Sequence, residues 1–127
     1  MKTYDPNQTP NPEQWLECDE SDRLDLVMTY HQSAGIEMPN TRIHAAFHTI
    51  VENQLAEGLA EVQNALDRLM EEGLDRHDAL HAIGSVLLDQ VQGIIQESSS
   101  GAGGKATQAY FLGLEKLTAK KWLASGQ

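Results

Sequence analysis

The chain has 127 residues, of which 40% are apolar, and it carries a formal net charge of −10. This size and composition are sufficient for one domain with a single hydrophobic core, which we expect to span residues 1–127. The acidic balance repels a phosphate backbone, so it argues against nucleic acid as the principal partner.

The cysteine content and the apolar stretches limit the cellular setting. Cys18 is the only cysteine, so the chain by itself forms neither an intrachain disulfide nor a cysteine-based zinc site. Residues 1–12 contain no apolar segment of a secretion signal, and no stretch approaches the ~20 apolar residues that span a bilayer. We therefore expect a cytoplasmic protein with no membrane span and with a flexible amino terminus over residues 1–11.

The first predicted helical region covers about residues 12–33. Asn11 followed by Pro12 is a favourable pair for the N-cap and the first helical position, and apolar side chains recur at helical spacing behind them. A break is expected near residues 19–21. Gly35 should end the region, because glycine readily adopts the left-handed conformation that often follows a helix.

Two further helices are predicted in the middle of the chain. Pro39 and Asn40 reset the backbone for a helix over about residues 41–57. A shorter helix over about residues 59–72 ends at Gly73. Both segments place apolar side chains three and four positions apart, which gives each helix one face for the core.

The fourth helix has the clearest sequence signals. Asp75 is a natural N-cap, and the helix that follows should run to about Glu97. Apolar residues recur along it at spacings of three and four, which is the period of a helix and not of a strand. They are Leu80, Ile83, Leu87, Val91 and Ile94.

A glycine- and serine-rich segment over residues 98–104 is predicted to be a flexible joint, because its side chains are too small to bury. A last helix should follow over about residues 105–124, with an apolar face that packs on its own bundle or on a second copy. The joint permits either arrangement, so a homodimer that exchanges this helix is a hypothesis for the partner. Together these elements predict an all-α fold: a four- to five-helix bundle with an up-and-down core and this C-terminal helix beyond the joint.

The five histidines are the main functional signal, because four of them form two pairs with a spacing of four residues. His44 and His48 lie on the second predicted helix, and His77 and His81 lie on the fourth. Side chains at this spacing are about 6 Å apart on one helix face, close enough for two imidazoles to reach one ion. Glu52 continues the first stripe, which gives the pattern His-x3-His-x3-Glu.

Helix topology predicts that the two pairs meet. Short connections make consecutive helices antiparallel, so the second and fourth helices should be parallel and begin at the same end of the bundle. Counted from the expected caps at Asn40 and Asp75, the pairs differ in depth by only about 3 Å. His31 falls near the end of the first helical region, so all five histidines can share this end. Taken alone, His31 is interpreted as structural.

These residues predict a metal site formed by His44, His48, His77 and His81, with Glu52 as the candidate for a further ligand. Helix amino termini and burial both favour neutral imidazole, which is the form that binds a metal. Imidazole-rich ligation favours zinc, iron, nickel or copper over magnesium or calcium, and we expect zinc, iron or nickel.

Two alternatives to a metal-binding protein of unknown reaction stay open. In the first, the chain is a metal-free interaction or dimerisation module whose histidines are structural or pH-sensitive. In the second, an ion with an open coordination position activates water for hydrolysis. The sequence shows neither a separate nucleophile nor a dedicated base, so whether the protein is an enzyme is left undecided.

The segment from Pro39 through the His44, His48 and Glu52 stripe, together with the one from Asp75 through His81, resembles an uncharacterised group of small bacterial helical proteins. The resemblance covers about residues 39–90 and implies a bacterial origin and a domain of unknown function. A more distant similarity, carried by His48 with Glu52 and by His77 with His81, is to hemerythrin-like di-iron bundles. No His-x4-Asp follows on the last helix, as that pattern requires. Four-helix metal proteins of the damage-inducible type, with three histidines on one ion, are a second loose analogy.

Overall fold

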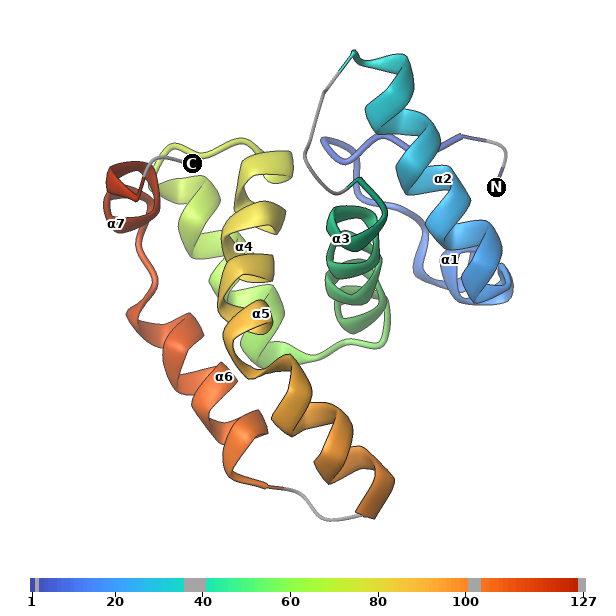
Figure 1. Cartoon of the computed structure of the whole chain (residues 1–127). Helices are drawn as coiled ribbons and strands as arrows, with labels where there is room; N and C mark the ends of the chain where they lie inside the picture. Colours follow the sequence, from blue (N-terminus) through green and yellow to red (C-terminus); the bar gives the residue numbers. More distant parts are fainter. Residues whose placement is uncertain (2, 36–40, 101–103, 126–127) are drawn as a thin grey trace.

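The computed structural model describes residues 1, 3–35, 41–100 and 104–125. Within these ranges the chain folds into α-helices without a strand, and the predicted all-α bundle is confirmed (Figure 1). The helices are α1 (Pro12–Glu17), α2 (Glu20–Ser33), α3 (Thr41–Ala56), α4 (Ala60–Glu71), α5 (Arg76–Ser100), α6 (Lys105–Lys116) and α7 (Ala119–Ala124).

The first helical region begins and breaks where the sequence predicts. The Asn11 side chain accepts a hydrogen bond from the Gln14 amide at 3.1 Å, and extended backbone at Cys18 and Asp19 separates α1 from α2. Gly35 follows α2 with a φ of 72°, in the left-handed region that glycine tolerates. The predicted reset at residues 39 and 40 lies outside the described residues.

The start of α5 is confirmed, and its end differs from the expectation. The Asp75 side chain accepts a hydrogen bond from the Asp78 amide at 2.8 Å, which caps the helix at Arg76. The helix continues to Ser100 and so includes residues 98–100 of the segment expected to be a joint. Residues 101–103 of that segment lie outside the described residues.

The single helix predicted over residues 105–124 is divided between α6 and α7. Leu117 adopts extended backbone with a ψ of 131°, and the Thr118 side chain caps α7 by accepting from the Lys121 amide at 3.1 Å. Arg68 of α4 donates to the carbonyl oxygens of Leu114 and Leu117, both at 2.7 Å. The Arg68 guanidinium thus takes the place of the backbone N–H groups that would bond these two carbonyls in a continuous helix. The sequence near residue 117 gives no sign of this contact, because Arg68 is far away in the chain.

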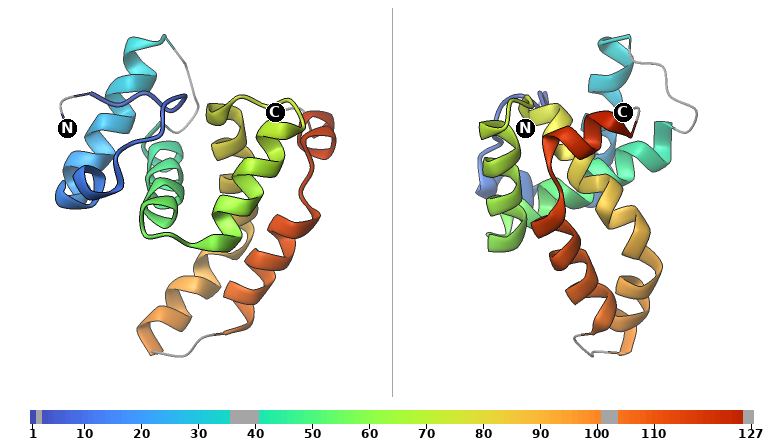
Figure 2. Two further views of the ribbon diagram at one scale, coloured as in Figure 1. Left: turned by 180° about the vertical axis from the view of Figure 1, so that it is seen from behind. Right: turned by 90° about the vertical axis from the view of Figure 1, so that its left-hand side faces the viewer.

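Helix α3 lies between α1 and α2 on one side and α4 and α5 on the other (Figures 1 and 2), and it contributes to two hydrophobic clusters. The larger cluster joins α3 to α4, α5, α6 and α7, with Val51, Leu69 and Ile83 among its buried residues. The smaller cluster is formed by Tyr4, Trp15, Val27 and Ala45, so it joins the amino-terminal segment, α1 and α2 to α3. Helix α3 therefore contributes side chains to both clusters.

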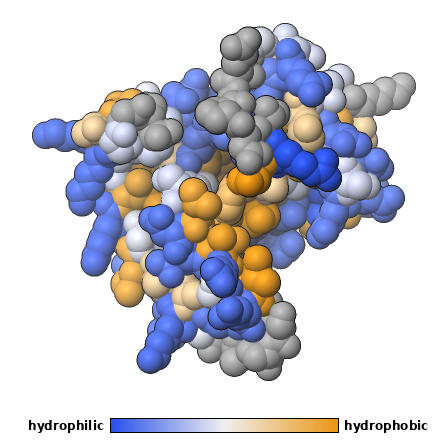
Figure 3. Space-filling model, viewed as in Figure 1, coloured by the Kyte–Doolittle hydropathy of each residue, from blue (hydrophilic) through white to orange (hydrophobic). Residues whose placement is uncertain are grey.

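The C-terminal helices pack on their own bundle. Tyr110, Leu114 and Trp122 are buried in the larger cluster, which is the first of the two arrangements expected for this apolar face. Exposed apolar side chains nevertheless gather near the middle of the face shown in Figure 3. Among the large apolar side chains of α3 and α5, those of Ile43, Leu88 and Ile95 are more than half exposed. The homodimer stays a prediction.

Among the described residues, no helix combines the length and apolar character needed to cross a bilayer.

The close approach of α5 and α6 gives a testable prediction about stability. A Cβ atom added at Gly93 would lie 2.6 Å from the Ala106 Cβ, whereas one added at Gly84 would lie 3.8 Å from the Phe47 Cβ. We expect Gly84→Ala to raise the free energy of unfolding by about 0.5–1 kcal/mol through helix propensity. Gly93→Ala should lower it by about 1 kcal/mol, because overpacking outweighs that gain.

Urea unfolding followed by circular dichroism measures both variants. Equal stability of Gly93→Ala and Gly84→Ala would contradict the tight packing of α5 against α6.

Candidate metal centre

All five histidines lie together in one cluster. His31 comes from α2, His44 and His48 come from α3, and His77 and His81 come from α5. One ring nitrogen of each lies within 4.8 Å of the corresponding nitrogens of the other four. The predicted meeting of the two histidine pairs is therefore confirmed, and the structure adds His31 as a full member of the cluster.

The cluster is created by three helix ends. His31 lies in the last turn of α2, and the two pairs begin within the first turns of α3 and α5. The spacing of four residues stacks each pair on one face, with ring centroids 4.2 Å apart for His77 and His81. Rings from different helices are equally close, since the His44 and His81 centroids are 4.3 Å apart.

Four of the five rings, those of α3 and α5, have lowered pKa values that favour the neutral form. His31, His48 and His77 are buried, and burial together with the neighbouring rings lowers the pKa of His81 to about 2. Burial and His31 lower the pKa values of His44 and His77 to about 4, although Asp75 and Asp5 oppose the shift at His77. The pKa of His48 is also lowered well below its ordinary value, chiefly by burial. Unprotonated rings offer the lone pairs that a metal ion needs.

In two pairs of histidines, the Nε2 atoms lie within hydrogen-bond distance of each other. The Nε2 atoms of His44 and His81 are 2.8 Å apart, and those of His31 and His77 are 3.2 Å apart. The His31 Nδ1 donates to the Val27 carbonyl oxygen at 2.8 Å, which leaves its Nε2 as an acceptor. Without an ion, His77 therefore donates to His31. With an ion between them, both Nε2 atoms can supply lone pairs instead.

Glu52 has a different set of partners from the one expected of a ligand. The sequence makes it a candidate for a further metal ligand, and it is not among the residues of the described cluster. Its carboxylate accepts from the Arg76 Nη1 at 2.7 Å and from the Arg76 Nη2 at 2.8 Å, and it also accepts from the Tyr4 hydroxyl. Both carboxylate oxygens therefore accept hydrogen bonds, and Glu52 is linked to His48 through the Tyr4 hydroxyl.

The amino-terminal segment contributes side chains to the surroundings of the cluster. Tyr4 and Pro6 are buried, and Tyr4 contacts the cluster through His48, whereas the flexibility expected of residues 1–11 stays a prediction. The Pro6 carbonyl accepts from Arg76 at 3.0 Å, and the Asn7 side chain accepts from the His77 amide at 3.0 Å. These bonds attach the segment to the start of α5.

Sequence reasoning missed Tyr4 and Arg76 as site residues. Arg76 directly precedes His77 at the start of a predicted helix, so its position could have drawn attention to it. Tyr4 carries no such signal, because its contact with His48 joins residues that are 44 positions apart. Burial and the nearby Glu52 carboxylate raise the pKa of the Tyr4 hydroxyl, which therefore keeps its proton.

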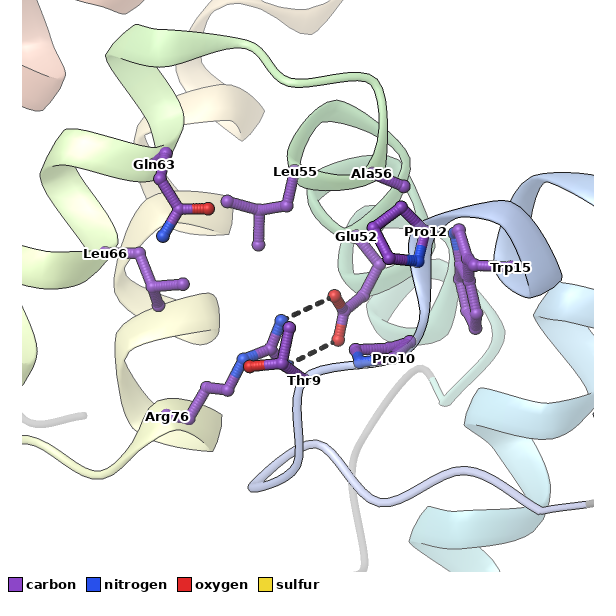
Figure 4. A pocket seen from close by; sticks show the side chains of 10 residues that line it. All are labelled: Thr9, Pro10, Pro12, Trp15, Glu52, Leu55, Ala56, Gln63, Leu66 and Arg76. Carbon is purple, nitrogen blue, oxygen red and sulfur yellow. Dashed lines mark hydrogen bonds and ion pairs between the residues drawn. The ribbon is translucent and has the colours of Figure 1, made fainter.

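A cavity of about 90 Å³ borders the Glu52–Arg76 ion pair (Figure 4). Its wall is formed mainly by residues 9–15 of the amino-terminal segment and α1, and by side chains of α3 and α4. None of the five histidines lines it, so it is separate from the histidine cluster.

Comparisons with protein-family models, with curated proteins and with solved structures found no match. The residues of the cluster and their geometry are therefore what indicates a function.

The lowered pKa values predict that the metal-free protein loses stability in acid. Below the ordinary pKa of 6.5, the histidines of the unfolded chain bind protons, whereas folded His44 and His77 stay neutral until about pH 4. Protonation then stabilises the unfolded state. Stability should fall by about 1.4 kcal/mol per pH unit for each histidine that titrates only in the unfolded chain. Above pH 6.5 this effect is absent.

The urea midpoint, measured with a chelator between pH 7.5 and 5, tests this prediction. The double variant His44→Gln/His81→Gln should show a shallower dependence, because two of the neutral rings are gone. A wild-type midpoint that stays constant over this range would contradict the buried, neutral state of the cluster.

Proposed function

We propose that this protein binds a single divalent transition-metal ion through the imidazoles of His31, His44, His48, His77 and His81. The observation that carries the proposal is the convergence of five ring nitrogens within 4.8 Å of one another. Metal–nitrogen bonds of about 2.1 Å place nitrogens on opposite sides of one ion about 4.2 Å apart. The cluster therefore needs only a small contraction to hold one ion.

The type of ligand limits the metals. Imidazole nitrogen suits zinc, iron, nickel and copper, whereas magnesium and calcium prefer oxygen ligands. Among these we propose zinc, iron or nickel. Four of the five nitrogens complete a tetrahedral zinc site, whereas all five leave one position open on an octahedral iron or nickel ion. The neutral rings favour loading at physiological pH, since no proton has to be displaced from an imidazolium.

The contacts of Glu52 bear on the distant resemblance to hemerythrin-like bundles. That resemblance implies a carboxylate ligand at Glu52, but both of its oxygens accept hydrogen bonds from Arg76 and one of them also from Tyr4. We therefore propose a site of imidazoles alone, with Glu52 as an outer partner, and not a di-iron centre of that type.

A metal-free interaction module is the competing function. The contacts between ring nitrogens at 2.8 and 3.2 Å are compatible with this function, because neutral imidazoles can form such hydrogen bonds with each other when no ion is present. In that case the cluster would be a packing device, and the exposed apolar side chains of α3 and α5 would carry the function. The two functions differ in metal content.

Elemental analysis of untagged protein, purified without added metal or chelator, tests the proposal. We expect about one equivalent of zinc, iron or nickel. His44→Gln/His81→Gln should weaken binding by more than roughly 100-fold, because it removes two ligands where loss of one outer partner costs 10–100-fold. These two rings are only partly buried, so helicity should be retained.

Tyr110→Phe is the matched control, because this buried hydroxyl bonds Gln54 at 2.7 Å, away from the cluster. It should bind metal like the wild type. Metal at 1,000 times its dissociation constant should also stabilise the wild type by about 4 kcal/mol. A wild-type protein that contains no metal, and is not stabilised by adding zinc, iron or nickel, would leave the interaction module as the better explanation.

A further inference from the structure

A chain of buried hydrogen bonds connects Arg76 to His48. Arg76 donates through Nη1 and Nη2 to the two oxygens of Glu52, at 2.7 and 2.8 Å. The Tyr4 hydroxyl donates to Oε2 of the same carboxylate, and its oxygen is also 2.7 Å from the His48 Nε2. All four side chains are buried, so water does not compete for these bonds.

The protons in this chain can be assigned from the donor and acceptor inventory. A guanidinium only donates, and a carboxylate that accepts at both oxygens has no proton to give. The single proton of the Tyr4 hydroxyl is therefore directed to Glu52. Towards His48 the hydroxyl oxygen is left to accept, so the proton of the neutral His48 ring must be on Nε2. The lone pair of His48 is then on Nδ1.

The His48 Nδ1 is the atom that this assignment leaves without a partner. It is buried, in a residue that is only 2% exposed, and it forms no hydrogen bond with any of the described residues. Buried polar atoms are paired in the great majority of cases, so an unpartnered lone pair beside four other histidines is suited to bind a cation. His31 has the opposite arrangement, because its Nδ1 donates to Val27 and its Nε2 faces the cluster.

We infer that Tyr4 is a positioning residue for the metal centre: it holds His48 in the tautomer that presents Nδ1 to the ion. The inference rests on the proposed metal site and adds the ligand atom of His48 and the residue that selects it. Tyr4 receives its own orientation from Glu52, which Arg76 holds on two sides. A partner that fixes the second nitrogen of a ligand histidine in this way commonly contributes 10–100-fold to metal affinity.

The amino-terminal segment is consequently part of the metal centre. Tyr4 reaches His48 because Arg76 and His77, at the start of α5, bind Pro6 and Asn7 of the same segment. The Tyr4 ring also packs 5.5 Å from Trp15 between ring centroids, which keeps the hydroxyl in place. Removal of the hydroxyl alone should therefore disturb the His48 tautomer and leave the packing intact.

Nitrogen-15 NMR of histidine-labelled full-length protein tests the tautomer directly, in the metal-free and the cadmium-113-loaded states. We expect His48 to carry its proton on Nε2 in both states, and to show cadmium coupling at Nδ1. His31 is the internal reference, with its proton on Nδ1 and coupling at Nε2. A proton on the His48 Nδ1, or cadmium coupling at its Nε2, would overturn the inference.

Tyr4→Phe provides the matched measurement of affinity for zinc(II), by competition with a chromophoric chelator. The affinity should fall 10–100-fold, and the single His48 tautomer should give way to a mixture. Tyr110→Phe, which removes a buried hydroxyl elsewhere, should change neither quantity.

The outcomes separate the inference from the proposed function. Wild-type protein that binds none of zinc, iron, nickel and cadmium would overturn both. Wild-type binding that Tyr4→Phe leaves unchanged, with the same His48 tautomer in both proteins, would overturn the role of Tyr4 and leave the metal site in place.

Discussion

Five imidazoles can share one buried volume only if they stay uncharged. A protonated ring would lose its hydration and would face other rings whose centroids lie as close as 4.2 and 4.3 Å. The fold therefore lowers the pKa values of the four rings on α3 and α5 and favours their neutral state, which is also the state that binds transition metals. The condition for packing these residues together and the condition for loading an ion are the same.

The Glu52–Arg76 ion pair shows how the protein places a carboxylate next to this cluster. A lone buried carboxylate would be costly, but the bidentate guanidinium compensates its charge, and the Tyr4 hydroxyl adds a further bond. The pair also connects α3 to α5, and through Pro6 it reaches the amino-terminal segment. One buried network thus orients His48 and joins three parts of the chain.

Helix α3 explains why the histidine cluster lies where it does. One part of its surface packs with α4 and α5 in the larger hydrophobic cluster, and Ala45 packs with the amino-terminal segment and α2 in the smaller one. His44 and His48 are therefore held between α2 and α5, the two helices that supply the other three rings. The apolar packing on both sides of α3 replaces the covalent cross-links that a chain with one cysteine cannot form.

The elements that follow from local physics could be predicted from the sequence. Helix periodicity, the Asn11 and Asp75 caps and the break between α1 and α2 depend on neighbouring residues, and each lies where its pattern indicates. The spacing of His44 with His48 and of His77 with His81 likewise sets which rings share a helix face. Short helix connections were enough to predict that the two pairs meet.

Contacts between distant segments were decided by the tertiary structure alone. The sequence indicates that Glu52 lies on the face of His48, but only the approach of Arg76 and Tyr4 determines that its carboxylate is occupied. The same holds for the division between α6 and α7, where Arg68 binds carbonyls 46 and 49 positions away. Spacing fixes side chains relative to their own helix, whereas the partner of a buried charge depends on which helices come together.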